Sequence, residues 1–308
     1  MKIYKLGGNV LKDKSTRNSI YKQLKNQNEK MILVVSAIKE TPFSTDNLLS
    51  LLENNDDYYI QERLQTTGEL ISSFIICNEL KNLYVNCDVL FPEEIGIIVE
   101  KEENQILNYQ FDASILEAKL QQCNILICPG FTAIDQNQKI VSLNRGGSDL
   151  TAILIAKMTN TPEVTYFKDV PGVGICDPKY YTNHKIYSNV SYDKMILFSK
   201  HGANILQLEA IKKAKEYNIQ MHIQHYALQN QGTLIHHKKG DSSLGINILE
   251  NKVYMDGFSN ANLIKKILFE NDLKYDLIIS MDESIEITTN YQNEKDILKV
   301  ICSSLLRS

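Results

Sequence analysis

Arg145 stands before two glycines, Gly146 and Gly147, and the residues Ser148 and Asp149 then open an apolar helical pattern. Glycines let the backbone approach a ligand closely. A helix N-terminus offers unpaired N–H groups, and a guanidinium holds a carboxylate or phosphate with two parallel donors. These five residues predict an anion site, with Ser148 or Asp149 capping the helix. A plain glycine turn with a helix cap is the alternative interpretation.

A second glycine pair, Gly7 and Gly8, follows the short strand expected at 3–6. Its backbone N–H groups are expected at the carboxyl edge of a sheet, where open α/β folds bind ligands. Lys5 stands just before the pair, within reach of a phosphate held there. An ordinary strand-to-helix turn with a surface lysine is the alternative.

Further polar residues are expected at or near strand ends. Ser36 lies at the carboxyl end of a buried run, Thr45 follows in the next loop, and Asp169 follows the strand at 164–167. An aspartate in that place can hold Mg²⁺ through water or orient a lysine. Glu69 precedes an apolar helix at 70–77, where it is either an acid stabilised by the helix dipole or a carboxylate that meets an ammonium group.

The elements that position these residues alternate between strand and helix through the first 235 residues. This pattern predicts an α/β fold: a mostly parallel open sheet with helices on both faces. A polar segment at 237–242 marks a domain boundary. Beyond it, two strands, a helix, two strands and a helix predict a small α+β unit of the ferredoxin-like kind. We therefore expect domains at 1–238 and 243–308.

Composition excludes several classes of function. The 308-residue chain is 43% hydrophobic and 23% charged, with a net charge of -4, which argues against a general nucleic-acid binder. The six cysteines show no paired spacing and mostly stand in apolar runs, as reduced core residues do. No long apolar run or leader pattern is present, so we expect a cytoplasmic protein without a membrane segment. The Walker-type phosphate loop and the protein-kinase motifs are absent.

Taken in order, the motifs resemble those of the aspartate kinases in the amino-acid kinase family. The resemblance spans about 235 residues in chain order, and Arg-Gly-Gly-Ser-Asp is its most specific piece. The matching stretches are Lys5-Leu6-Gly7-Gly8, Val34-Val35-Ser36-Ala37, Thr45-Asp46-Asn47-Leu48, Gly68-Glu69, Pro129-Gly130-Phe131, Arg145 to Asp149, Lys168 to Gly172 and Asp177-Pro178-Lys179. The C-terminal residues resemble one ACT regulatory unit, where the family usually has two.

The resemblance implies phosphoryl transfer from ATP, with Mg²⁺, to the β-carboxylate of aspartate. Positioning and charge neutralisation carry most of such a reaction, and the acceptor carboxylate is its own nucleophile. The implied catalytic residues are Lys5, Arg145 and Asp169. The implied substrate-binding residues are Ser36, Thr45, Glu69, Phe131, Arg145, Ser148 and Asp149. The implied nucleotide-binding residues are Lys5, Gly7, Gly8, Lys168, Asp169, Gly174, Asp177, Lys179 and Asn204, and no protein metal site is implied.

The chain departs from the family pattern mainly on the nucleotide side. Lys168 replaces a threonine, Asn204 stands where many members carry lysine, and Asn9 replaces a small hydroxyl residue. Lys168 would then supply the positive charge missing at Asn204. Two alternatives stay open: a kinase of the same fold for another amino or hydroxy acid, and a catalytically weak amino-acid sensor. The open sheet edge of a single ACT-like unit predicts a homodimer or larger assembly, as a regulatory or dimerisation domain would form.

Overall fold

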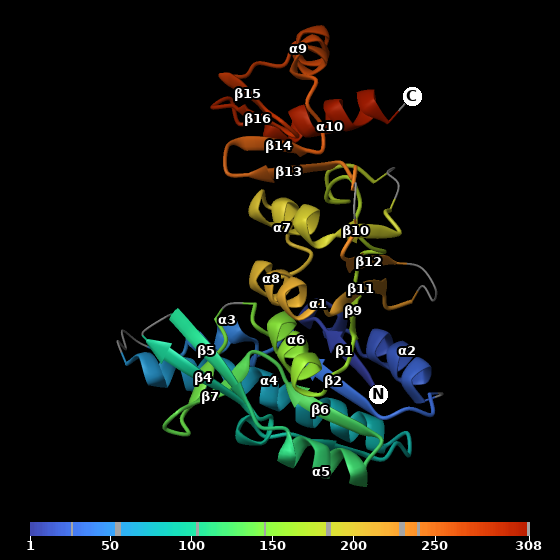
Figure 1. Cartoon of the computed structure of the whole chain (residues 1–308), viewed down its shortest axis with the longest axis vertical. Coiled ribbons are helices and arrows are strands. Elements are labelled where there is room, and N and C mark those ends of the chain that lie inside the picture. Colours follow the sequence, from blue (N-terminus) through green and yellow to red (C-terminus); the bar gives the residue numbers. More distant parts are fainter. Residues whose placement is uncertain are drawn as a thin grey trace. The chain divides into compact units, whose positions relative to one another are not determined.

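The computed structural model describes residues 1–25, 27–52, 57–102, 105–144, 146–182, 186–227, 232–238 and 241–306. The chain divides into two compact units (Figure 1). The first comprises Met1–Asp169 and Lys213–Asn230, and the second comprises Val170–Lys212 and Gln231–Ser308. Each unit is described by itself below.

The first unit is built on parallel strands in the order β11-β9-β1-β2-β6-β3. Continuous apolar runs form the central strands, and all five residues of β2 are buried, as expected for a parallel sheet covered on both faces. The bounds are β1 Lys2–Leu6, β2 Met31–Val35, β3 Cys87–Val89, β6 Ile125–Pro129, β9 Glu163–Lys168 and β11 Gln220–His225. The predicted α/β fold with a mostly parallel sheet is confirmed.

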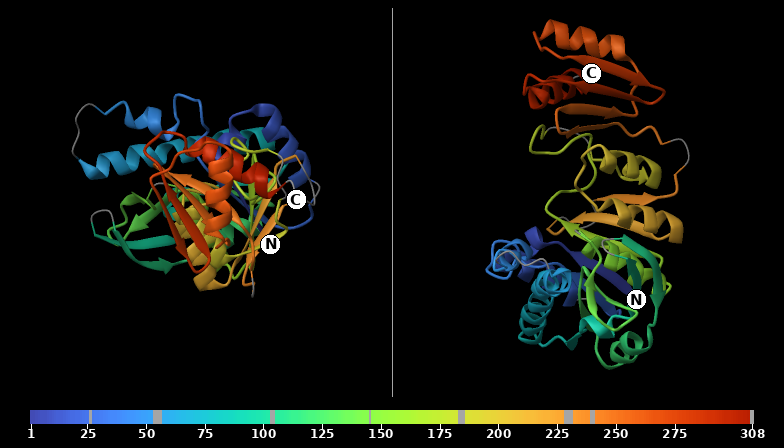
Figure 2. Two further views of the ribbon diagram at one scale, coloured as in Figure 1. Left: turned by 90° about the horizontal axis from the view of Figure 1, so that it is seen from above. Right: turned by 90° about the vertical axis from the view of Figure 1, so that its left-hand side faces the viewer.

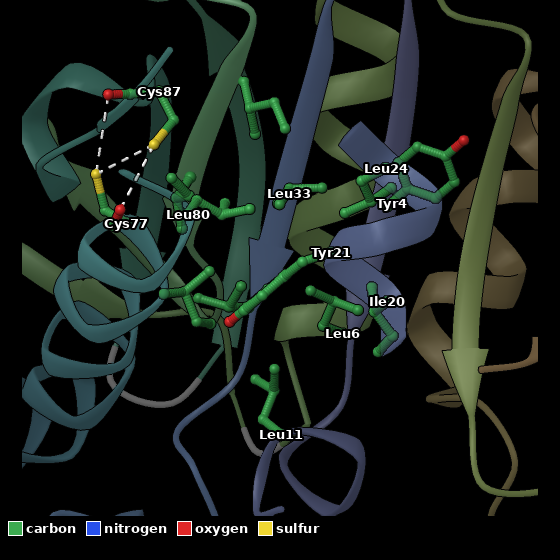
Figure 3. Close-up of a cluster of buried hydrophobic side chains, with 14 of the residues drawn as sticks. Tyr4, Leu6, Leu11, Ile20, Tyr21, Leu24, Leu33, Cys77, Leu80 and Cys87 are labelled. Atoms are coloured by element: carbon green, nitrogen blue, oxygen red, sulfur yellow. Dashed lines mark hydrogen bonds between the residues drawn. The ribbon is translucent and has the colours of Figure 1, made fainter. Parts of the chain in front are cut away.

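Helices cover both faces of this sheet. Tyr21 and Leu80, from two helices on one face, belong to the same buried cluster as Leu33 of β2, and Figure 3 shows this cluster together with the neighbouring thiols of Cys77 and Cys87. Helix α6 packs against β1, β2 and β9. The helices of this unit are α1 Gly8–Leu11, α2 Lys14–Lys25, α3 Thr45–Leu49, α4 Tyr58–Lys81, α5 Ser114–Gln122 and α6 Ser148–Met158.

A smaller sheet in the first unit has the order β5-β4-β7-β8. Strands β4 and β5 pair antiparallel as a hairpin, with a register shift between Glu100 and Lys101. Strand β8 ends at Ser142 and leads into the turn before α6. The bounds are β4 Ile97–Glu102, β5 Gln105–Phe111, β7 Thr132–Asp135 and β8 Ile140–Ser142, and a 3₁₀ turn, η1, spans Pro92–Glu94.

The second unit contains a parallel strand pair, β10–β12, and a four-stranded antiparallel sheet with the order β13-β14-β16-β15. One face of that sheet packs against α9 and α10 around a single apolar cluster, and Figure 2 shows these elements from two further directions. The small C-terminal α+β arrangement is thus confirmed. The bounds are β10 Asn189–Ser191, α7 Tyr192–Lys200, β12 Thr233–His236, β13 Gly245–Leu249, β14 Lys252–Asp256, α9 Ala261–Glu270, β15 Leu277–Met281, β16 Ser284–Thr288 and α10 Glu294–Leu305, with α8 Leu208–Tyr217 shared between the units.

Two local expectations are wrong. Glu69 does not start a helix, because α4 runs without a break from Tyr58 to Lys81, so the helix-dipole interpretation of this acid falls. The helix passes through Gly68 because the glycine permits a close approach: a Cβ there would lie 2.5 Å from the carbonyl oxygen of Phe43.

No helix of the described ranges is long and apolar enough to cross a membrane.

The expected cap of α6 is the second correction. Gly147 occupies the N-cap position and no side chain caps the helix, because Ser148 and Asp149 lie inside its first turn. Their oxygens make long-range contacts instead of capping bonds. Helix α3 likewise lacks a side-chain capping bond: it begins at Thr45, and the N-cap residue Ser44 makes none.

Candidate functional site

A buried ion pair joins Lys5 of β1 to Asp149 in the first turn of α6. The Lys5 Nζ lies 2.6 Å from Asp149 Oδ1, and both residues are about one-twentieth exposed. Strand alternation explains the direction of the lysine. Tyr4 and Leu6 belong to the cluster beneath α2 and α4, so Lys5, between them, points to the opposite face, where α6 begins.

A second lysine reaches the same carboxylate. Lys168 ends β9, next to β1 in the sheet, and its Nζ lies 3.5 Å from Asp149 Oδ2. Burial lowers the pKa of Lys168; Asp149 opposes this effect and Lys5 adds to it. Two ammonium groups on one carboxylate leave these three residues with an excess positive charge. Placing such a charge away from water is costly unless an anion joins it.

Ser148 links the turn before α6 to the end of β2. Its Oγ lies 2.8 Å from Ser36 Oγ. Gly130 makes this approach possible, since a Cβ there would lie 2.5 Å from Ser148 Cβ. The turn itself uses Asn144 and Gly146, both with positive φ. Arg145, the expected carboxylate clamp, lies outside the described residues.

Glu69 is a buried carboxylate in the middle of α4. Within the part of the chain that the structure describes, its Oε2 has no hydrogen-bond partner. Burial raises the pKa of Glu69 to about 8, an effect opposed by backbone N–H groups of Ala37 and Glu69 and, more weakly, by Lys5. A cationic ligand group at Oε2 would supply the missing partner and favour the charged form.

The glycine pair adjoins the end of β2. Gly8 opens α1, and a Cβ on it would lie 2.5 Å from the carbonyl oxygen of Ala37. Gly7 is partly exposed and lies near the Lys5 ammonium: a Cβ there would be 3.8 Å from Nζ. Asn9 Nδ2 donates to Asp169 Oδ2 at 3.4 Å, and Asp169 is exposed. An exposed carboxylate oxygen of this kind suits a hydrated Mg²⁺.

The remaining expected residues are more dispersed. Phe131 is buried with φ 67° and its N–H donates to Thr151 Oγ1 at 2.9 Å, whereas Thr45 is half-buried at the start of α3. The other four belong to the second unit. Asp177 and Lys179 form an exposed ion pair of 2.8 Å, Asn204 is exposed, and Gly174 forms a backbone bridge with Ile186.

Sequence interpretation missed a second buried ion pair in the first unit. Glu62 of α4 and Lys101 of β4 lie 2.9 Å apart, and both side chains are less than 5% exposed. Glu62 stands seven residues before Glu69, a spacing that puts both acids on one face of a helix. That spacing was the available signal, but it became readable only once the helix was known to include both residues.

The family of this chain follows from its similarity to known proteins. The model of the amino acid kinase family matches residues 1–225. This chain belongs to the amino acid kinase family. Lys5, Ser148, Asp149 and Lys168 all lie within the matched range.

Relatives and solved structures agree with this assignment. An aspartokinase of Bacillus sp. (strain MGA3) is 26% identical over 228 residues, covering 74% of this chain and 55% of the relative. Aspartokinase 2 of Bacillus subtilis (strain 168) is 28% identical over 228 residues, covering 73% and 54%. The chain thus spans about half the length of the curated relatives that it matches. The structure of E. coli aspartokinase III with aspartate and ADP shares the fold over 96% of this chain and 80% of its own, with a TM-score of 0.68 and 17% identity.

Proposed function

We propose that the protein transfers the γ-phosphoryl group of ATP to the β-carboxylate of L-aspartate, forming 4-phospho-L-aspartate and ADP. The observation that carries this proposal is the Lys5–Asp149–Lys168 cluster, a buried excess of positive charge at the carboxyl ends of two parallel strands. Such a cluster suits a migrating phosphoryl group. Relatives named aspartokinase support aspartate as the acceptor.

In this reaction a β-carboxylate oxygen attacks the γ-phosphorus as the bond from phosphorus to the β–γ bridging oxygen breaks. ADP takes the electron pair of that bond, and no general base is required. Lys5 and Lys168 neutralise charge on the phosphoryl oxygens, and Asp149 holds both ammonium groups in place. The N–H groups of Gly7 and Gly8 are further donors to the phosphate.

A second group of residues is assigned to recognition of the amino acid. Glu69 accepts the substrate ammonium at Oε2, which has no hydrogen-bond partner among the described residues. Arg145 is assigned to a substrate carboxylate, and Ser36, Thr45, Phe131 and Ser148 are assigned to the rest of the amino acid. Because the Ser36 and Ser148 hydroxyls already contact each other, they present a fixed pair of groups to substrate oxygens.

Asp169 of the first unit is assigned to the nucleotide, and the family resemblance implies the same role for Gly174, Asp177, Lys179 and Asn204 of the second unit. Mg²⁺ arrives with ATP as part of the substrate, and the exposed Asp169 carboxylate is suited to binding it through water. The metal neutralises charge on the β- and γ-phosphates. Residues 1–238 then form the catalytic domain of an enzyme in the synthesis of the lysine and threonine group of amino acids.

Residues 243–308 are proposed to be a single ACT-like regulatory or dimerisation domain, through which two copies associate. Strand β15 is an edge strand, and its alternate residues Leu277, Ile279 and Met281 are each more than 40% exposed. An edge with unpaired backbone groups and an apolar stripe favours pairing with a second copy. We therefore propose a homodimer or a larger homo-oligomer.

The test is ADP release with a panel of acceptors, namely aspartate, glutamate, homoserine and malate, each with ATP and Mg²⁺. Aspartate-dependent release supports the proposal. If ADP is released only with another acid, that acid is the acceptor in place of aspartate, and the reaction is still phosphoryl transfer to an acid. A folded protein that binds aspartate but releases no ADP above the ATP-only background would instead be an amino-acid sensor.

A further inference from the structure

The buried ion pair of Glu62 and Lys101 has no role in the chemistry proposed above, yet the lysine ammonium bonds to both oxygens of the carboxylate. Lys101 Nζ lies 2.9 and 3.0 Å from the two carboxylate oxygens of Glu62. The register shift after Glu100 locally distorts β4 just before the lysine, as bulges do where a side chain is redirected.

Glu62 and Lys101 together make hydrogen bonds with all three polar groups of Ser142. The Ser142 N–H donates to Glu62 Oε2 at 2.9 Å, its hydroxyl donates to Glu62 Oε1, and its carbonyl accepts from Lys101 Nζ at 3.1 Å. Ser142 is the last residue of β8. The next residues form the turn that carries Ser148 and Asp149 into the site.

Glu62 also stands on the same helix as Glu69, the proposed ammonium acceptor. Glu62 and Glu69 lie on one face of this helix, two turns or roughly 10 Å apart along its axis. One ion pair therefore connects the helix that carries the proposed ammonium acceptor with Ser142, the strand end from which the chain runs on to Ser148 and Asp149. A buried ion pair adds little stability beyond that of an apolar pair of similar volume, so its value lies in its fixed geometry.

We propose that Glu62 and Lys101 are positioning residues that fix Ser142, and through it Ser148 and Asp149 at the start of α6, relative to Glu69, and so set the size of amino acid that the site accepts. The proposal rests on the proposed function, because the site must bind an amino acid for its size to matter. Neither residue touches the substrate. Their effect is on the distance between Glu69, assigned to the substrate ammonium, and the Ser148 hydroxyl, assigned to substrate oxygens.

The test replaces both partners, Glu62→Gln with Lys101→Met, because a single replacement leaves a buried charge unpaired. The glutamine keeps an acceptor for Ser142, and a cooperative urea transition verifies folding. We expect the KM for aspartate to rise about tenfold at an unchanged KM for ATP, since small misplacements of bound groups are costly. Preference for aspartate over the longer glutamate should fall. The matched control is Glu94→Gln with Lys119→Met, which removes the 2.6 Å pair between η1 and α5 and should leave both KM values unchanged.

A readout without turnover separates this proposal from the proposed function. Amide hydrogen exchange across residues 143–149 should be faster in the doubly substituted protein than in the wild type and the control. This holds even if the wild type phosphorylates no amino acid, in which case the proposed function fails alone. Wild-type exchange across 143–149, or a wild-type KM and selectivity in the folded variant, would overturn the positioning role.

Discussion

Glu69 is expected to make the protein less stable as the pH rises from 5 to 8. Burial raises the pKa of this carboxyl from 4.5 to about 8. Below pH 4.5 it is protonated in both the folded and the unfolded state. Between these two pKa values only the unfolded state loses the proton, so ionisation favours unfolding. The free energy of unfolding therefore falls with increasing pH, and the loss is complete above about pH 8.

The size of the effect follows from the two pKa values. Each pH unit between 4.5 and about 8 is worth about 1.4 kcal/mol, which gives a total of roughly 5 kcal/mol. Solvent screening reduces this free energy little, because Glu69 is only 4% exposed. Glu69→Gln keeps the shape of the side chain and removes the titration. The variant should thus be more stable than the wild type at pH 8, with a smaller difference at pH 5.

The assay is urea denaturation of wild type and Glu69→Gln at pH 5, 6, 7 and 8 without ligand. Other groups titrate alike in both proteins, so the difference between the two curves isolates Glu69. Parallel curves over this range would refute the reasoning that burial raises the pKa of Glu69. Because a substrate ammonium at Oε2 would restore the charged form, aspartate binding at pH 7 should also release close to one proton in the wild type and none in the variant, as measured by calorimetry in two buffers of different ionisation enthalpy.

Three further predictions concern other parts of the structure. Lys168→Met should lower kcat by about 10²–10³ with little change in the KM for aspartate, since it removes one donor to the transition state; an equal effect on KM alone would contradict the role. Gly68→Ala should destabilise the first unit by roughly 1–3 kcal/mol in urea denaturation, because its Cβ would meet the Phe43 carbonyl at 2.5 Å; wild-type stability would show that α4 moves freely there. Ile279→Lys should convert dimer to monomer by light scattering while leaving kinase activity per chain intact, since it places a charge on the exposed edge strand β15; an unchanged assembly would exclude this edge.

The main sheet and the small C-terminal sheet could be predicted because their signals are local. The apolar run at β2 and the alternation of strands and helices need no knowledge of distant contacts. The extent of α4 was not predictable in the same way. Gly68 and the polar residues before it looked like a helix start, and only the close packing of Gly68 against the segment containing Phe43 explains why the helix continues.

The individual residues of the site could be predicted from the sequence better than the contacts between them. Lys5, Asp149 and Lys168 each carried a sequence signal, but their convergence depends on three elements that are distant in the sequence. Asp149 was expected among the substrate-binding residues, whereas the structure places it between two lysines. Glu62 and Lys101 carried no motif, because a buried ion pair is defined by its partner and not by its neighbours in the chain.

The most direct test of the central claim is to trap the product. The protein is incubated with ATP, Mg²⁺ and L-aspartate in the presence of hydroxylamine, which converts an acyl phosphate into a stable hydroxamate. The account predicts aspartate β-hydroxamate together with an equal amount of ADP, and loss of both in Lys5→Met. ATP-binding wild-type protein that yields no aspartate hydroxamate would contradict it.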